Sequence, residues 1–163
     1  MIKQVWCAML GISLALGAQQ KAGDQKAEGD RKAEDKRSTD TVTHSAGFLK
    51  LVDDAKSRIQ EIDIAAYQKM VAAKEAHVLV DTREDSEWAA GHMAGAVHLS
   101  KGIIERDIEA KVPDKSTRIV LYCGGGFRSA LAADNLQKMG YTNAISLDGG
   151  WRALKDSGLK VEK

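Results

Sequence analysis

Cys123 has the clearest capacity for chemistry, because of the residues that surround it. It ends the apolar run of residues 119–122 and is followed by three glycines, an aromatic residue and an arginine: Gly124, Gly125, Gly126, Phe127 and Arg128. Glycine adopts backbone angles that other residues avoid, so this chain can curl with its N–H groups facing inward. Such a curl would form a cradle for an anion.

Two further features favour a thiolate at Cys123. A helix is predicted to begin near Arg128, so its positive dipole end points toward the cradle, and the guanidinium of Arg128 adds a full charge. A buried, inert cysteine before a tight turn is the simpler alternative, but it explains neither the arginine nor the helix start at this spacing. The segment also lacks the Lys-Ser/Thr end of a nucleotide P-loop. We therefore predict a nucleophilic cysteine.

Composition narrows the classes of ligand. The 24 basic and 23 acidic side chains nearly cancel, so the net charge indicates neither nucleic acid nor an anionic membrane surface as a partner. Cys7 and Cys123 are the only cysteines, too few for a disulfide framework or a multi-thiolate zinc site, and His44, His77 and His98 lack the spacing of metal ligands. We predict a small-molecule substrate, with no metal and no other cofactor.

The first 43 residues divide into two parts by composition. Residues 1–18 have a lone Lys3, an apolar run over residues 5–16 and then small residues, the pattern of a secretory signal peptide. This run is shorter than the ~20 residues that span a bilayer, so no stable membrane insertion is expected. Residues 19–43 are predicted to be a charged flexible linker, since residues 21–37 contain no large apolar side chain. We expect an exported protein, periplasmic if its source is a Gram-negative bacterium.

The remaining residues, 44–163, are expected to form one domain in which helices and strands alternate. Phe48, Leu51, Val52, Ala55 and Ile59 recur at helical spacing. Strands are predicted at residues 61–64, 77–81, 96–99, 118–123 and 143–147, and helices at residues 65–74, 102–111 and 128–139. This alternation is typical of an α/β fold with a parallel sheet, in which ligands bind beyond the carboxyl ends of the strands. Cys123 lies at such an end.

Three segments resemble the rhodanese family, single-domain α/β proteins that pass sulfur from donors such as thiosulfate to thiophilic acceptors through a cysteine persulfide. Residues 79–99 contain Asp-x-Arg, Glu-Trp and Gly-His-x-x-Gly-Ala, the second segment is the Cys123 loop, and the third is Leu-Asp-Gly-Gly-Trp at residues 147–151. The resemblance implies a rhodanese-like fold, with a mainly parallel central sheet and helices on both faces.

The resemblance also implies roles for the loop residues. Cys123 would be the catalytic residue, and the backbone of residues 124–128 would hold the persulfide. The segment from Cys123 to Arg128 has six residues, the size that goes with sulfur transfer in this family, whereas relatives that handle phosphate or arsenate have a loop one residue longer. Arg128 would either face the substrate anion or pair with a nearby carboxylate, and Phe127 would make the entrance more apolar.

Two residues outside the loop carry open alternatives. Arg83 would either contact an anionic substrate or form a buried pair with Asp81 that supports the loop. His92 lies in the Gly-His-x-x-Gly-Ala element, which shapes a turn in rhodaneses, so a structural role is favoured over that of a general base. Ser129 is expected to cap the helix or, less simply, to donate a hydrogen bond into the loop.

Sulfur transfer is accordingly the favoured function, with thiosulfate as an example of the donor and cyanide or a thiol as an acceptor. A phosphatase or arsenate reductase on the same fold, and a noncatalytic module that binds sulfur or anions, remain alternatives. A lone thiolate in an oxidising compartment is open to oxidation, so a reducing thiol protein is a further candidate partner.

Overall fold

The computed structural model describes residues 43–163, which form seven strands and six helices in the part of the chain that it covers. Their order is α1 (Ala46–Lys56), β1 (Gln60–Ile62), α2 (Ile64–Ala72), β2 (Val78–Asp81), α3 (Asp85–Ala90), β3 (His92–Met93), β4 (Val97–His98), α4 (Ile104–Lys111), β5 (Ile119–Tyr122), α5 (Phe127–Lys138), β6 (Ala144–Leu147), α6 (Gly150–Lys155) and β7 (Val161–Glu162). The predicted signal peptide and nearly all of the predicted linker lie outside the described residues.

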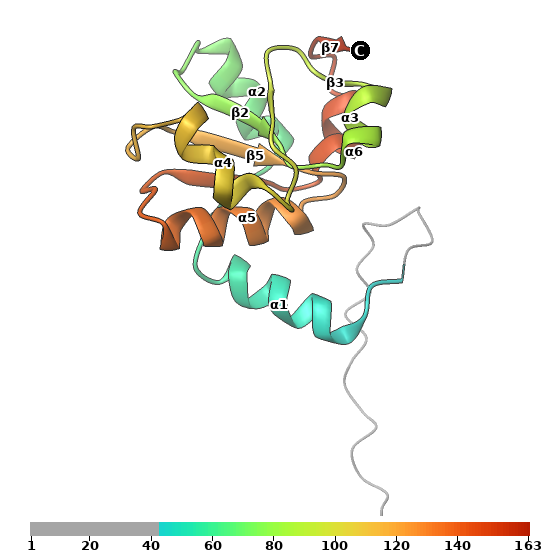
Figure 1. The fold of residues 1–163 in the computed structure, drawn as a ribbon. Coiled ribbons are helices and arrows are strands. Elements are labelled where there is room, and N and C mark those ends of the chain that lie inside the picture. Colours follow the sequence, from blue (N-terminus) through green and yellow to red (C-terminus); the bar gives the residue numbers. More distant parts are fainter. Residues whose placement is uncertain (1–42) are drawn as a thin grey trace, which may run out of the picture. The chain divides into compact units, whose positions relative to one another are not determined.

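Five strands form the central sheet, in the order β1-β6-β5-β2-β4 (Figure 1). Every neighbouring pair is parallel, and β5 lies in the middle with β6 and β2 on its two sides. The strands β3 and β7 pair separately as a short antiparallel ribbon. The loop after β5 therefore begins at the centre of the carboxyl edge of the sheet.

Helices cover both faces of this sheet, and the residues of β5 show how the core is divided. Ile119 and Leu121 point to one face, where they pack with α4 and α5, whereas Val120 and Tyr122 point to the other, where they pack with α2 and α6. All four side chains are fully buried. This confirms the predicted α/β fold with a mainly parallel sheet between two layers of helices.

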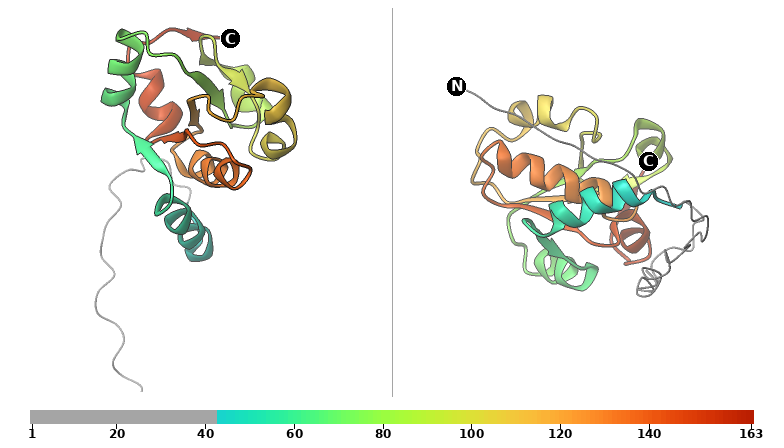
Figure 2. Two further views of the ribbon diagram at one scale, coloured as in Figure 1. Left: turned by 90° about the vertical axis from the view of Figure 1, so that its left-hand side faces the viewer. Right: turned by 90° about the horizontal axis from the view of Figure 1, so that it is seen from below.

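The helix α1 adds to the first of these layers by packing against α5 (Figure 2). Ser45 caps its first turn by accepting a hydrogen bond from the backbone N–H of Phe48. At its other end, Arg58 donates two hydrogen bonds to Asp134 of α5, at 2.9 and 3.0 Å. The C-terminal end of α1 is thus held beside α5.

Among residues 43–163, no helix has the length and apolar character needed to cross a membrane.

Candidate active site

Cys123 follows the last residue of β5 directly, and its side chain is buried, with the whole residue 2% exposed. The backbone N–H of Gly126 donates a hydrogen bond to Cys123 Sγ, with the two atoms 3.2 Å apart. Gly126 is the residue that precedes α5 and has a φ of +100°, a conformation that favours glycine. The loop therefore folds back on the sulfur atom through the N–H of Gly126, and it leads directly into the N-terminus of α5.

Ser129 lies behind the loop, in the first turn of α5. Its hydroxyl group lies 3.8 Å from Cys123 Sγ, donates to the carbonyl oxygen of Gly126 at 3.0 Å, and is 3.0 Å from Ser146 Oγ. The residue at the cap of the helix is Gly126. The favoured expectation that Ser129 caps the helix was therefore wrong, and the serine contributes hydrogen bonds to the loop instead.

The N-terminus of α6 is joined to the same loop by backbone hydrogen bonds. The N–H of Trp151 donates to the carbonyl oxygen of Cys123 at 2.6 Å, and the N–H of Arg152 donates to that of Gly124 at 3.2 Å. The guanidinium of Arg152 lies over the loop, because Nη1 would be 3.3 Å from a Cβ at Gly125. The third sequence segment thus serves to fix the loop that carries Cys123.

Arg128 pairs with a carboxylate, which is the second of the two alternatives predicted from the sequence. Its Nη1 and Nη2 atoms donate to the two carboxylate oxygens of Glu87, at 2.7 and 2.9 Å, and Nη1 lies 3.5 Å from Glu84 Oε1. The hydrogen bonds with Glu87 raise the pKa of Arg128, and those from Arg128 lower the pKa of Glu87. The guanidinium therefore ties the start of α5 to α3.

Glu87 was missed by the sequence reasoning, although a signal for it was present. Glu84 precedes α3 and Glu87 is the third residue of that helix, and the two form a capping box. The spacing of an N-cap residue and a glutamate three residues later is readable in the sequence. What could not be read was the proximity of Arg128, since the two residues are 41 positions apart.

Arg83 is buried against Asp81, as one of the two alternatives predicted. Its Nε lies 3.0 Å from both carboxylate oxygens of Asp81, and Nη2 donates to Asp81 Oδ2 and to the carbonyl oxygen of Gly91. The guanidinium carbon also lies 4.3 Å from the ring centre of Trp151, the residue whose N–H bonds to Cys123. Arg83 thus supports the loop through Trp151. A direct contact with substrate stays a prediction.

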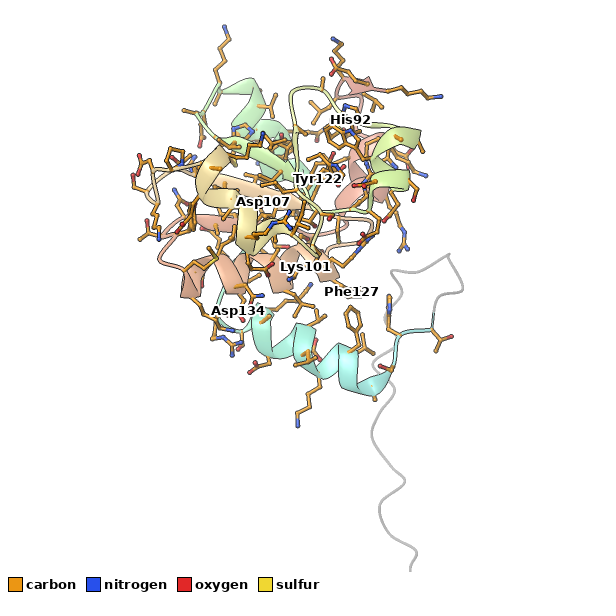
Figure 3. All side chains as sticks on the ribbon, in the orientation of Figure 1. His92, Lys101, Asp107, Tyr122, Phe127 and Asp134 are labelled. Atoms are coloured by element: carbon orange, nitrogen blue, oxygen red, sulfur yellow. The ribbon has the colours of Figure 1, made fainter. Side chains whose placement is uncertain are left out.

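The ring of Phe127 is turned toward the N-terminal part of α1 (Figure 3). It makes edge-to-face contacts with His44 and Phe48, with ring centres 4.8 and 6.1 Å apart, and Lys56 Nζ lies 5.8 Å from its centre. Phe127 is half-buried as a result. The aromatic residue of the loop therefore anchors the loop to α1.

His92 is stacked on Trp88, with ring centres 3.4 Å apart and an interplanar angle of 11°. Its Nδ1 lies 3.2 Å from the carbonyl oxygen of Trp88, and His98 stacks on the same indole with its Nε2 2.9 Å from the carbonyl oxygen of Arg83. These contacts agree with a structural role for His92. Within residues 43–163, no group of three or more His, Cys, Asp or Glu side chains is placed to hold a metal ion.

A comparison with protein families decides which class of α/β protein this is. Residues 63–157 match the model of the rhodanese-like domain, a span that contains Arg83, Glu87, the loop and the N-terminus of α6. The chain belongs to the rhodanese-like domain family. The match begins after α1, so the helix that contacts Phe127 lies outside the matched part of this rhodanese-like protein.

The rhodanese-like domain is similar in sequence to proteins whose names refer to sulfur transfer or sulfur carriage. It is 36% identical over 93 residues to the thiosulfate sulfurtransferase GlpE of Pseudomonas entomophila, an alignment that covers 55% of this chain and 84% of that protein. It is 31% identical over 96 residues to the "Putative sulfur carrier protein YrkF" of Bacillus subtilis (strain 168), which covers 59% of this chain and about half (51%) of the relative.

One solved structure matches a larger share of this chain than these two relatives do. A protein of unknown function from Rhodopseudomonas palustris CGA009, described as a possible tyrosine phosphatase, has a TM-score of 0.63 and 28% identity, and the match covers 74% of this chain and 97% of that one. The descriptions of these relatives thus name a thiosulfate sulfurtransferase and a possible tyrosine phosphatase. Fold alone does not decide between the two activities.

Proposed function

We propose that this protein is a sulfurtransferase in which Cys123 carries the transferred sulfur atom as a persulfide. The observation that carries the proposal is the hydrogen bond from the Gly126 N–H to Cys123 Sγ, inside a loop of six residues that ends at Arg128. Inward-facing N–H groups stabilise negative charge on sulfur, as an oxyanion hole does on oxygen. The similarity to a named thiosulfate sulfurtransferase supports the same chemistry.

The reaction has two steps, each of which conserves atoms and charge. In the first, the thiolate of Cys123 attacks the outer sulfur of thiosulfate, the sulfur–sulfur bond breaks, and sulfite leaves with the electron pair. Cys123 then carries Cys–S–S⁻. In the second, cyanide or a thiolate attacks the terminal sulfur, which restores the Cys123 thiolate and releases thiocyanate or a new persulfide. Neither step needs a general base, in keeping with the stacking of His92 on Trp88.

The test is the mass of the intact protein after incubation with thiosulfate. We expect a gain of one sulfur atom on Cys123, which disappears when cyanide is added as thiocyanate forms. The variant Cys123→Ser should neither gain the sulfur nor turn over. Wild-type protein that takes no sulfur from thiosulfate or from an organic persulfide would contradict the proposal.

Phosphoester hydrolysis is the second candidate, because a similar structure is described as a possible tyrosine phosphatase. Incubation with p-nitrophenyl phosphate separates the two activities. Release of p-nitrophenol that requires Cys123, without any sulfur adduct, would favour the phosphatase. A protein that binds sulfite or thiosulfate but shows neither reaction would be a noncatalytic anion-binding module.

We further propose that the chain is exported and loses residues 1–18, on the basis of their signal-peptide pattern. Its partners would be a small sulfur donor, a thiophilic acceptor and a thiol protein that keeps Cys123 reduced. The mass of the protein recovered from the periplasm of a Gram-negative expression host tests the cleavage. Recovery from the cytoplasm at full length would contradict it.

A further inference from the structure

The guanidinium of Arg128 is matched by negative charge from α3. Both carboxylate oxygens of Glu87 accept hydrogen bonds from it, and Glu84 Oε1 is 3.5 Å from the same guanidinium. A bidentate ion pair has no net charge, so it acts on an approaching anion only as a dipole. The negative charge of Glu87 therefore cancels most of the attraction that Arg128 would exert on a substrate. Arg128 therefore gives an incoming dianion little net attraction.

The carboxylate of Glu87 also lies close to the residue that follows the nucleophile. A Cβ placed on Gly124 would be 3.4 Å from Arg128 Nη2 and 3.8 Å from Glu87 Oε1. The pair thus lies directly beside the loop, and the Glu87 side chain is 37% exposed, so its charge acts partly through protein and partly through water. A carboxylate beside the loop repels an anion that enters it, and two like charges about 4 Å apart repel by more than the thermal energy even in water.

We propose that Glu87 makes this site discriminate against dianionic sulfur donors and favours organic persulfides that carry one negative charge or none. This inference rests on the proposed sulfur transfer and adds the class of donor. Thiosulfate has two negative charges and must approach a thiolate, so an uncompensated arginine would favour it. Glu87 removes that advantage by pairing with Arg128.

The step with such a donor is balanced without a further reagent. The thiolate of Cys123 attacks the outer sulfur of R–S–SH, the donor's sulfur–sulfur bond breaks, and R–S⁻ leaves with the electron pair. Cys123 is left as Cys–S–SH, and no net oxidation occurs.

Other charged groups near the loop belong to different elements. The guanidinium of Arg152 lies over Gly125, and Asp148 Oδ1 would be 3.5 Å from a Cβ at Gly126 and is 3.7 Å from Lys56 Nζ. These groups are unchanged by substitutions in the Glu87–Arg128 pair. A test that alters only the Glu87–Arg128 pair therefore isolates the effect of that pair on the charge around the loop.

The test compares alkylation of Cys123 by anionic iodoacetate and by neutral iodoacetamide, followed by mass analysis of the peptide that contains Cys123. Because the ratio of the two rates cancels general changes in reactivity, it reports the local charge and needs no sulfur transfer. We expect Glu87→Gln to raise the iodoacetate/iodoacetamide ratio by roughly five- to tenfold and Arg128→Gln to lower it comparably. The double variant should return close to the wild-type ratio, since it removes one charge of each sign.

A matched control removes one carboxylate elsewhere. Glu109→Gln on α4, where Glu109 pairs with Lys115, should leave the ratio unchanged. If Glu87→Gln does not fold, the low ratio of Arg128→Gln must rise toward the wild-type value in high salt, which screens the unpaired carboxylate. A ratio that neither substitution changes would overturn the proposal.

Sulfur donors give the second readout. In Glu87→Gln, the KM for thiosulfate should fall by about five- to tenfold, whereas that for the persulfide of 2-mercaptoethanol should change little. Equal changes for both donors would overturn the inference. A shifted alkylation ratio in a protein that accepts no sulfur from any donor would support the role of Glu87 in charge selection and overturn the proposed function alone.

Discussion

The α-carbon of Gly150 lies against the carbonyl group of Cys123, so closely that a Cβ at Gly150 would overlap the carbonyl oxygen and lie 3.0 Å from the carbonyl carbon. Its φ of +49° is also one that L-residues with side chains rarely adopt. The close approach allows the N–H of Trp151 to reach the same oxygen. Glycine is therefore required here for two separate reasons.

Gly150→Ala should be severely destabilising, because the loop and the start of α6 would have to separate. We expect the free energy of unfolding to fall by more than about 3 kcal/mol, as measured by urea denaturation, with loss of sulfur transfer. Gly158→Ala is the matched control, since Gly158 has a φ of +79° with open space around its α-carbon and should cost only about 1 kcal/mol. Equal losses of unfolding free energy in the two variants would show that the close approach of Gly150 to the Cys123 carbonyl group does not contribute to stability.

Arg83→Met tests the buried pair. Asp81 is fully buried, so the substitution leaves an uncompensated carboxylate in the interior and should cost about 3–5 kcal/mol of unfolding free energy. Adding Asp81→Asn should restore part of that loss. A stable Arg83→Met protein with a raised KM for thiosulfate would instead favour the direct substrate contact that the sequence left open.

Phe48→Ala tests the anchoring of the loop to α1. The substitution removes the ring that contacts Phe127, and we expect the unfolding free energy to fall by about 1–2 kcal/mol. Leu51→Ala, on the same helix and 61% exposed, should change it by less than about 0.5 kcal/mol. If both variants unfold alike, α1 does not hold the loop through Phe127.

Asp134 should make stability depend on acid pH. Hydrogen bonds from Arg58, and next from Lys138, lower the pKa of this buried carboxyl to about 2 from its usual value near 3.8. The carboxylate therefore stabilises the fold fully above about pH 4, and the contribution is lost as the pH falls through about 2. Asp134→Asn should reduce the unfolding free energy by about 2 kcal/mol at pH 7.

The pH profile supplies the control for that prediction. The difference between wild type and Asp134→Asn should shrink steadily between pH 4 and about pH 2, as followed by denaturation at fixed ionic strength. Asp54→Asn removes an exposed carboxylate that bonds the same Arg58 and should leave the profile nearly unchanged. A constant difference at all pH values would mean that ionisation of Asp134 is not the cause.

Much of the fold could be predicted because its elements have strong local signals. The apolar residues of β5, followed by Cys123 and three glycines, indicated a buried strand, a curl and a helix start. The ends of the predicted strands and of α2, α4 and α5 lie within two residues of those observed, whereas Ile59, expected on the first helix, lies three residues beyond the end of α1. The six-residue helices α3 and α6 and the two-residue strands β3 and β7 went unpredicted. Such short elements carry too few residues for a periodic pattern.

The site was predicted where its parts are contiguous and missed where they are not. The loop residues are neighbours in sequence, so the turn that brings the Gly126 N–H to Cys123 Sγ could be inferred from glycine geometry. The pairing of Glu87 with Arg128 and the position of Arg152 over Gly125 depend on how α3 and α6 are placed by the sheet. Contacts across dozens of residues leave no trace in local composition.

The attachment of α6 to the loop also sets an order of events during synthesis. The carbonyl groups of Cys123 and Gly124 find their partners only at residues 151 and 152, and β5 is flanked on one side by β6, which is made later. Parallel pairings of this kind require a crossover and form slowly. On the ribosome, the nucleophile is therefore made well before the segment that completes its surroundings, and it stays uncovered until residues 151 and 152 have emerged.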